Sequence, residues 1–247
     1  RVGAKMLVFA DGRIVGTIGG GCYENDAFWK AREAITARRP QLLHYELSDD
    51  FAQETGLICG GQMDVYIEPI EPSPELYVIG AGHVGHQLAT LAGAVGFNVH
   101  VVDDREKFAN RDRFPTAASI VNEDIPAWIA RTPLPSHAYV VIVTRGHTND
   151  LEALRALAPR DLRYLGLIGS RAKVARIYEE LQNNGIGADC LTRVHAPIGL
   201  DIGAVTPQEI AVSILAELIA VKHGKFSQRD AAGLSMKWQP PKLSSGQ

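Results

Sequence analysis

The hydrophobic pattern of the first 70 residues mixes strand and helix signals. An apolar hairpin is expected around the turn dipeptide Asp11-Gly12, and apolar positions recur at helical spacing from Glu24 to Arg38. Apolar residues then predict strands at residues 42–47 and 63–67. Together these elements predict a small α+β domain over residues 1–70.

The pattern changes at residues 71–75, where prolines and acidic residues interrupt the apolar runs and predict a stiff, exposed linker. Beyond it, apolar strands alternate with helices. We expect strands at residues 76–79, 98–102, 139–143 and 164–168, and helices at residues 86–95, 150–157, 172–183 and 207–223. This alternation predicts an α/β domain over residues 76–226, in which helices cover both faces of a parallel sheet. Residues 227–247 are expected to form a polar tail.

A glycine-rich turn joins the first strand and helix of the second domain. Gly80, Gly82 and Gly85 form a G-x-G-x-x-G pattern, which lets the backbone approach a pyrophosphate and direct amide N–H groups at it. Asp103 ends the next strand about 20 residues later, where a carboxylate binds a ribose 2′-hydroxyl. The pattern predicts a Rossmann-like fold with a bound nucleotide. The alternative is that the glycines only permit close packing, with Asp103 as a turn residue at the strand end and His83 as a capping or exposed side chain.

Two further loops follow later strands of the predicted sheet. Because ligands of such sheets bind beyond the carboxyl ends of the strands, we expect Arg145, His147, Ser170 and Arg171 to face the same crevice as the glycine turn. Arg171 and Lys173 flank the start of a helix, which would attract an anion. Alternatively, Ser170 only caps the helix, the cations are solvated, and His147 has a capping or core role.

A third group of polar residues lies in a glycine-rich segment that holds His195 and Asp201. We expect a loop there and therefore a more exposed histidine than one in a core. No spacing of Cys, His and Asp residues in this segment matches a dedicated metal site.

The first domain places two thiols beside glycines. Gly20, Gly21 and Cys22 come just before a predicted helix, a position that favours a reactive thiolate, and Cys59 precedes a glycine pair. Both are candidates for contact with a ligand, and Cys22 is also a candidate for contact with a metal. The alternative is two small buried thiols beside tight turns.

Composition narrows the function classes. The chain has 247 residues and a net charge of −3, so nothing in its charge favours a nucleic-acid partner. No stretch approaches the roughly 20 apolar residues of a membrane span, and no secretory signal is visible at the start. Three cysteines form no even disulfide framework, and we expect a cytoplasmic protein. Because residue 1 is Arg, we expect that the chain begins inside a longer protein.

Six separated motifs resemble, in their order, those of the XdhC/CoxI family. The motifs are Gly19-Gly20-Gly21-Cys22-x-Glu24, Cys59-Gly60-Gly61, Gly80-Ala81-Gly82-His83-Val84-Gly85, Ile168-Gly169-Ser170-Arg171, His195-Ala196-Pro197-Ile198-Gly199-Leu200-Asp201-Ile202-Gly203 and Thr206-Pro207-x-Glu209-Ile210-Ala211. The resemblance extends from the first strand to about His223.

The resemblance implies an accessory protein rather than an enzyme. Family members bind the molybdopterin form of the molybdenum cofactor, alone or joined to a nucleotide, and protect it while a cysteine desulfurase partner supplies sulfur. They then pass it to an apo molybdenum hydroxylase such as xanthine dehydrogenase. We also expect a homodimer. The rival hypotheses are an NAD(P)-dependent oxidoreductase with His147 or His195 as acid or base, and a regulatory protein that senses nucleotides.

Overall fold

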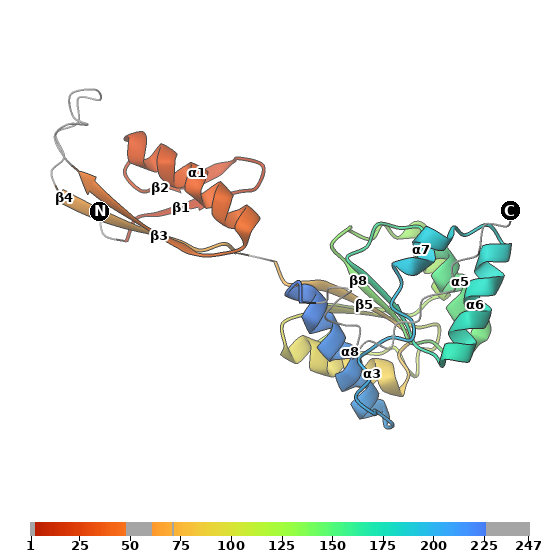
Figure 1. Ribbon diagram of the computed structural model, residues 1–247. Helices are drawn as coiled ribbons and strands as arrows, with labels where there is room; N and C mark the ends of the chain where they lie inside the picture. Colours follow the sequence, from red (N-terminus) through yellow and green to blue (C-terminus); the bar gives the residue numbers. More distant parts are fainter. Residues whose placement is uncertain (1–2, 48–60, 71, 226–247) are drawn as a thin grey trace, which may run out of the picture. The chain divides into compact units, whose positions relative to one another are not determined.

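The computed structural model describes residues 3–47, 61–70 and 72–225 (Figure 1). The chain divides into two compact units, Arg1–Pro72 and Ser73–Gln247. Cys59, Glu71 of the predicted linker and the predicted tail at 227–247 lie outside the described residues. Glu75, the last residue of the predicted linker, already begins a strand of the second unit.

The first unit consists of one helix and two antiparallel hairpins. The hairpins are β1 (Lys5–Val8) with β2 (Ile14–Thr17), and β3 (Gln41–Leu47) with β4 (Gly61–Ile67); α1 spans Gly21–Ala37. Gly12, with φ of +91°, forms the first turn where Asp11-Gly12 predicted it. The helix contacts β1, β3 and β4 and buries Ala27 and Ala34. A core this small leaves much apolar surface exposed.

The second unit confirms the predicted Rossmann-like α/β fold. Its strands are β5 (Glu75–Ile79), β6 (Asn98–Val102), β7 (Ser119–Val121), β8 (Tyr139–Ile142) and β9 (Tyr164–Leu167). Its helices are α3 (His83–Ala94), α4 (Ile125–Arg131), α5 (His147–Leu157), α6 (Arg171–Asn183), α7 (Ala188–Thr192) and α8 (Pro207–Lys222). The strands form one parallel sheet in the order β7-β6-β5-β8-β9.

Helices cover both faces of this sheet. Alternate residues of β5 point to opposite faces, so Val78 joins the core beneath α3 and α8, whereas Ile79 joins the core beneath α4, α5 and α6. Residues of β8 and β9 are buried throughout, as expected for central strands covered on both sides. Among the described helices, none is both long and apolar enough to cross a membrane.

The segment around His195 extends the sheet beyond β9. His195 N–H donates to the Leu165 carbonyl at 2.8 Å, and the His195 carbonyl accepts from Leu167 N–H at 2.9 Å. This parallel pairing completes the strand order of a dinucleotide-binding sheet. The sequence predicted a loop here because the segment is rich in glycine, whereas the structure pairs His195 with β9, and an outermost strand tolerates the nearby Pro197.

Candidate functional site

The three glycines of the turn differ in what their surroundings require. Gly80 has φ of +113°, and a Cβ there would lie 2.5 Å from the Val143 carbonyl oxygen. A Cβ on Gly85 would lie 2.0 Å from the Gly80 carbonyl oxygen. Gly82 has an ordinary φ of −66°, and a Cβ on it would meet nothing within 4 Å. Packing therefore requires Gly80 and Gly85, whereas the space at Gly82 is open.

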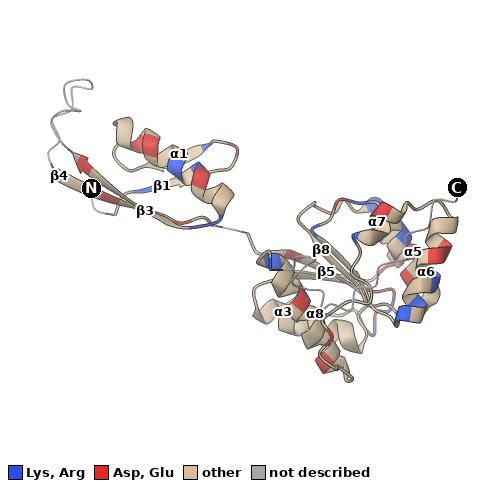
Figure 2. Ribbon diagram, viewed as in Figure 1, with Lys and Arg blue, Asp and Glu red and all other residues tan. Residues whose placement is uncertain are grey.

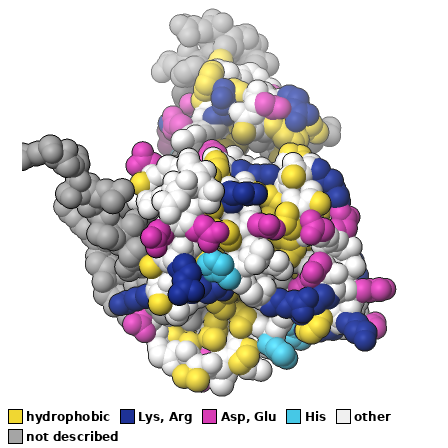
Figure 3. Space-filling view, turned by 90° about the vertical axis from the view of Figure 1, so that its right-hand side faces the viewer, with side chains coloured by type: hydrophobic (Ala, Val, Ile, Leu, Met, Phe, Trp, Pro, Cys, Tyr) yellow, Lys and Arg dark blue, Asp and Glu magenta, His cyan; other side chains and the backbone are white. Residues whose placement is uncertain are grey.

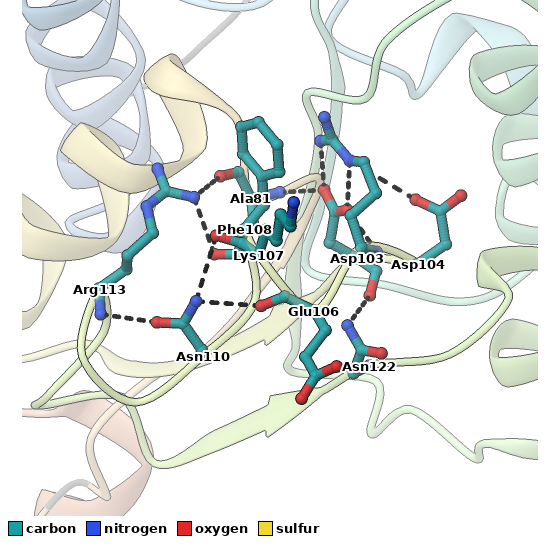
Figure 4. Close-up of polar contacts among 10 residues, drawn as sticks. Ala81, Asp103, Asp104, Glu106, Lys107, Phe108, Asn110, Arg113 and Asn122 are labelled. Carbon is teal, nitrogen blue, oxygen red and sulfur yellow. Dashed lines mark hydrogen bonds and ion pairs between the residues drawn. The ribbon is translucent and has the colours of Figure 1, made fainter.

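Asp103, the predicted ribose-binding carboxylate, is only 2% exposed and already has several hydrogen-bond partners (Figure 4). It accepts from Ala81 N–H at 2.7 Å and from the Arg105 guanidinium through Nε and Nη2, each at 2.8 Å. Burial raises the pKa of Asp103, but the hydrogen bonds from Arg105 and Ala81 outweigh it, so the net pKa is lowered. The Asp103 carboxylate is therefore ionised, and both of its oxygens already accept hydrogen bonds from the protein.

A second arginine ties the same turn to the loop that follows β6. Arg113 Nη1 donates to the carbonyl oxygens of Ala81, at 2.9 Å, and Phe108, at 2.8 Å. In Figure 4, Arg113 and Asp103 approach Ala81 from opposite sides. Sequence reasoning missed both Arg105 and Arg113, because the motif specifies only the carboxylate and the glycines.

A buried ion pair lies where β8 and β9 end. Asp150 in α5 is fully buried, accepts a hydrogen bond from Thr144 Oγ1 at 2.5 Å and pairs with Lys173 Nζ in α6. Burial raises the pKa of Asp150, although Lys173 and Thr144 oppose that shift. The pair joins the starts of two helices that both follow the carboxyl edge of the sheet.

The helix starts at this edge carry the other predicted residues. Ser170 caps α6 by accepting from Lys173 N–H at 3.2 Å, which is the capping role given above as the alternative to ligand binding. Arg145 and Arg171 are exposed, and neither occurs among the ion pairs of the described residues. His147 Nε2 lies 3.2 Å from Glu180 Oε2. His83 is exposed at the start of α3.

The charges of α6 run against the helix dipole. Arg171 and Lys173 lie in its first turn, whereas Glu180 lies near its end, and Figure 2 shows the cations gathered where α6 begins. A cation beside a helix N-terminus costs stability, typically about 0.3–1 kcal/mol, unless an anion is present. Lys173 is already paired with Asp150, so Arg171 is the cation of this turn that favours a bound anion.

The structure does not bring His195 to this edge. Its side chain is 8% exposed, and its Nδ1 lies 3.1 Å from Glu217 Oε1 of α8, which also accepts from the Tyr164 hydroxyl. His195 pairs beside the middle of β9 and faces the core, rather than lying in an exposed loop. Asp201 is exposed in the loop before α8.

In the first unit, Glu24 organises the glycine loop before α1. Its carboxylate accepts from Thr17 Oγ1, from Ile18 N–H at 2.9 Å and from Gly20 N–H at 3.1 Å, and these hydrogen bonds lower the pKa of Glu24. Gly20 and Gly21 have φ of +78° and +77°, and Cys22 is exposed in the first turn of the helix. In the described residues, no group of three or more His, Cys, Asp or Glu side chains is placed to hold a metal.

Models of known protein families match sequence in both units. The model of the XdhC Rossmann domain matches residues 76–218, and that of the XdhC and CoxI family matches residues 1–46.

Three known proteins resemble long stretches of the chain. It is 38% identical over 242 residues to the uncharacterized protein YqeB of Escherichia coli K12, an alignment that covers 98% of this chain but only 43% of YqeB. It is 22% identical over 270 residues to the molybdenum cofactor insertion chaperone PaoD of the same organism, covering 90% of this chain and 78% of PaoD. A solved structure of a xanthine dehydrogenase from Bacillus halodurans superimposes with a TM-score of 0.56 and 25% identity, covering 91% and 88% of the two chains.

Proposed function

The chain belongs to the XdhC and CoxI family, and on that premise we propose that it is an accessory protein that binds the molybdenum cofactor for a xanthine dehydrogenase-type enzyme. The names of PaoD and of the Bacillus halodurans protein support this assignment. Because the chain spans less than half of YqeB, the proposal concerns this portion and the cofactor that it binds.

The open space at Gly82 is the observation that supports this proposal most directly. Neither packing nor backbone conformation requires a glycine there, whereas close approach of a phosphate does. Gly82 precedes α3 without a side-chain cap, so the first amide N–H groups of that helix are available to an anion. Molybdopterin carries a phosphate, and its nucleotide form carries a pyrophosphate, so either suits this position.

The ion pair at Asp103 favours this proposal over an NAD(P)-dependent oxidoreductase. A ribose diol would have to displace Arg105 from two hydrogen bonds to a buried carboxylate. Losing such charge-assisted hydrogen bonds costs about 1.5–3 kcal/mol each. The position that normally selects NAD is therefore unfavourable for that ligand.

The finer steps extend the same proposal. The cofactor phosphate lies near Gly82, with Arg145, His147 and Arg171 along the same edge of the sheet. In the first unit, Cys22 stays a predicted ligand contact, and Cys59 lies outside the described residues. The bound cofactor is held for sulfuration by a cysteine desulfurase and then inserted into the apoenzyme. His195, buried against Glu217, forms no part of this site.

Direct binding measurements test the ligand. The full chain is titrated with purified molybdopterin cofactor and, separately, with NADH and NADPH. We expect micromolar binding of the molybdenum cofactor and binding of nicotinamide nucleotides at least about tenfold weaker, equivalent to about 1.4 kcal/mol. Micromolar binding of NADH without binding of molybdopterin would overturn the proposal.

A pair of glycine variants tests the location. Gly82→Ala should weaken cofactor binding about tenfold or more, because the new methyl group occupies the space that a phosphate would enter. Gly187→Ala is a matched control, since Gly187 also precedes a helix, has an ordinary φ of −61° and has nothing within 4 Å of a Cβ position. Equal binding by the two variants would remove the glycine turn from the site.

A further inference from the structure

A cavity lies at the opposite edge of the sheet from the glycine turn. Its volume is about 330 Å³, and its walls come from residues 158–165, which lead into the start of β9, and residues 190–194, at and just after the end of α7. Six of the residues that line it are Arg160, Leu162, Arg163, Cys190, Thr192 and Arg193. Because β9 begins at Tyr164, which also lines the cavity, the cavity is at the amino edge. It is therefore separate from the proposed cofactor site.

The charge of this cavity is unbalanced. Three guanidinium groups line it, and none of the ten described residues that line it is a carboxylate. None of these arginines occurs among the ion pairs of the part of the chain that the structure describes; the neighbouring Asp161 and Asp189 do not line the cavity. The chain as a whole is acidic, and on the face in Figure 3 cationic and acidic side chains are interspersed. Three cations around one cavity repel one another unless an anion binds.

Helix ends hold the three arginines in place. Arg160 Nη1 donates to the Thr132 carbonyl at 2.8 Å, and its Nη2 donates to Ile129, both at the end of α4. The other two make longer contacts: Arg163 Nη2 to Val221 at 3.4 Å in α8, and Arg193 Nη2 to Ala158 at 3.3 Å after α5.

These contacts use only part of each guanidinium. A helix C-terminus favours a cation, and each group has five N–H donors, so donors remain for a ligand. Because the groups are already positioned, less side-chain freedom is lost when a ligand binds.

We propose that this cavity binds the phosphate group of a small molecule. A phosphate carries up to two charges on oxygens that can each accept from a different guanidinium, which suits three arginines that come from separate segments. The volume is at the lower end of the range for small-molecule sites. The Cys190 thiol lines the same cavity and reports on its occupancy.

Alkylation of Cys190 in the full chain tests the proposal. Iodoacetamide labelling is followed peptide by peptide, with exposed Cys22 as the internal reference and inorganic phosphate or pyrophosphate as the probe. When the probe concentration is about ten times its dissociation constant, the rate of labelling of Cys190 should fall about tenfold, while the rate at Cys22 is unchanged. Acetate at equal ionic strength should not protect. No slowing by either probe, or equal slowing at Cys22 or by acetate, overturns the proposal.

Arginine variants identify the groups responsible. Arg163→Gln and Arg193→Gln replace exposed side chains, so both proteins should fold, and each should reduce protection of Cys190 at least about fivefold. Arg176→Gln, an exposed arginine of α6 that does not line the cavity, is the matched control and should keep full protection. Undiminished protection in both cavity variants would contradict the assignment.

Discussion

Asp103 and Arg105 form an ion pair that both supports the glycine turn and occupies the predicted ribose site. Asp103→Asn leaves Arg105 without its charged acceptor, so we expect the free energy of unfolding at neutral pH to fall by about 1.5–3 kcal/mol. Urea unfolding measures this change. Asp104→Asn is the control, since Asp104 is exposed and lies 3.7 Å from Arg105; an equal loss there would contradict the special role of Asp103.

The same pair predicts a pH dependence. Although burial opposes it, the pKa of Asp103 is lowered in the folded protein, so its stabilisation is present above the unfolded value of about 3.9. It is lost as the pH falls through the lower folded value. The stability difference between wild type and Asp103→Asn should therefore shrink below about pH 4. A difference that grows with acidification would assign the stabilisation to other groups.

The glycines of the turn should separate folding from binding. Gly85→Ala forces a methyl group against the Gly80 carbonyl, which we expect to destabilise the protein by about 1–3 kcal/mol or more. Gly82→Ala should change stability by less than about 0.5 kcal/mol, because its surroundings are open. Chemical denaturation of both variants checks the ordering, and a strongly destabilised Gly82→Ala protein would contradict the geometry.

At the scale of elements, the buried pair of Asp150 and Lys173 joins α5 to α6. Lys173→Met leaves a buried carboxylate without its cation, which costs about 3–5 kcal/mol. The double variant Asp150→Asn with Lys173→Met should lose less, because no unpaired charge remains. Unfolding measurements on the single and double variants decide this, and additive losses would show that the two side chains act independently.

The sign of the pH effect in this element is opposite to that of Asp103. Burial already raises the pKa of Asp150, and removal of Lys173 removes an interaction that opposes the rise. A carboxyl group with a raised folded pKa stabilises the folded state most when protonated, and this advantage is lost as the pH rises through that pKa. The Lys173→Met protein should therefore become more stable as the pH falls from neutral toward the unfolded carboxyl pKa of about 3.9, before general acid unfolding.

The elements also show what the sequence makes predictable. Long apolar strands and the Thr206-Pro207 start of α8 could be located because each has a local signal. The helix α4 was missed although Asp124 caps it and a proline follows in its first turn, a signal of the same kind. The three residues of β7 are too few for a recognisable period. The pairing of His195 with β9 depends on tertiary contacts that no local pattern encodes.

The sequence likewise predicted some features of the candidate site and not others. Gly80, Gly82 and Gly85 belong to a turn whose local geometry fixes their spacing, so the pattern located it. The roles of Arg113 and Glu217 depend on groups in distant segments, Ala81 for Arg113 and His195 for Glu217. Sequence alone therefore located the edge of the sheet, whereas the structure identified which groups there are already engaged.

At the scale of the whole molecule, exposed apolar surface is concentrated in the first unit. Of the eleven large hydrophobic side chains that are exposed in the described residues, seven belong to it: Leu7, Ile14, Val15, Trp29, Leu42, Tyr66 and Ile70. Leu42 and Tyr66 face each other across β3 and β4 and are 70% and 63% exposed. Adjacent exposed apolar side chains favour association with another protein surface.

This surface gives the expected homodimer a location that can be tested. Leu42→Lys combined with Tyr66→Lys adds charges to both members of the pair, and sedimentation velocity at micromolar concentrations should show a shift from dimer to monomer. Stability should change little, because both side chains are already in water. Val205→Lys alters an equally exposed residue of the second unit and should leave the dimer intact. If the wild-type chain is monomeric throughout, or if the double variant still forms dimers, this face of the first unit is not the self-association surface.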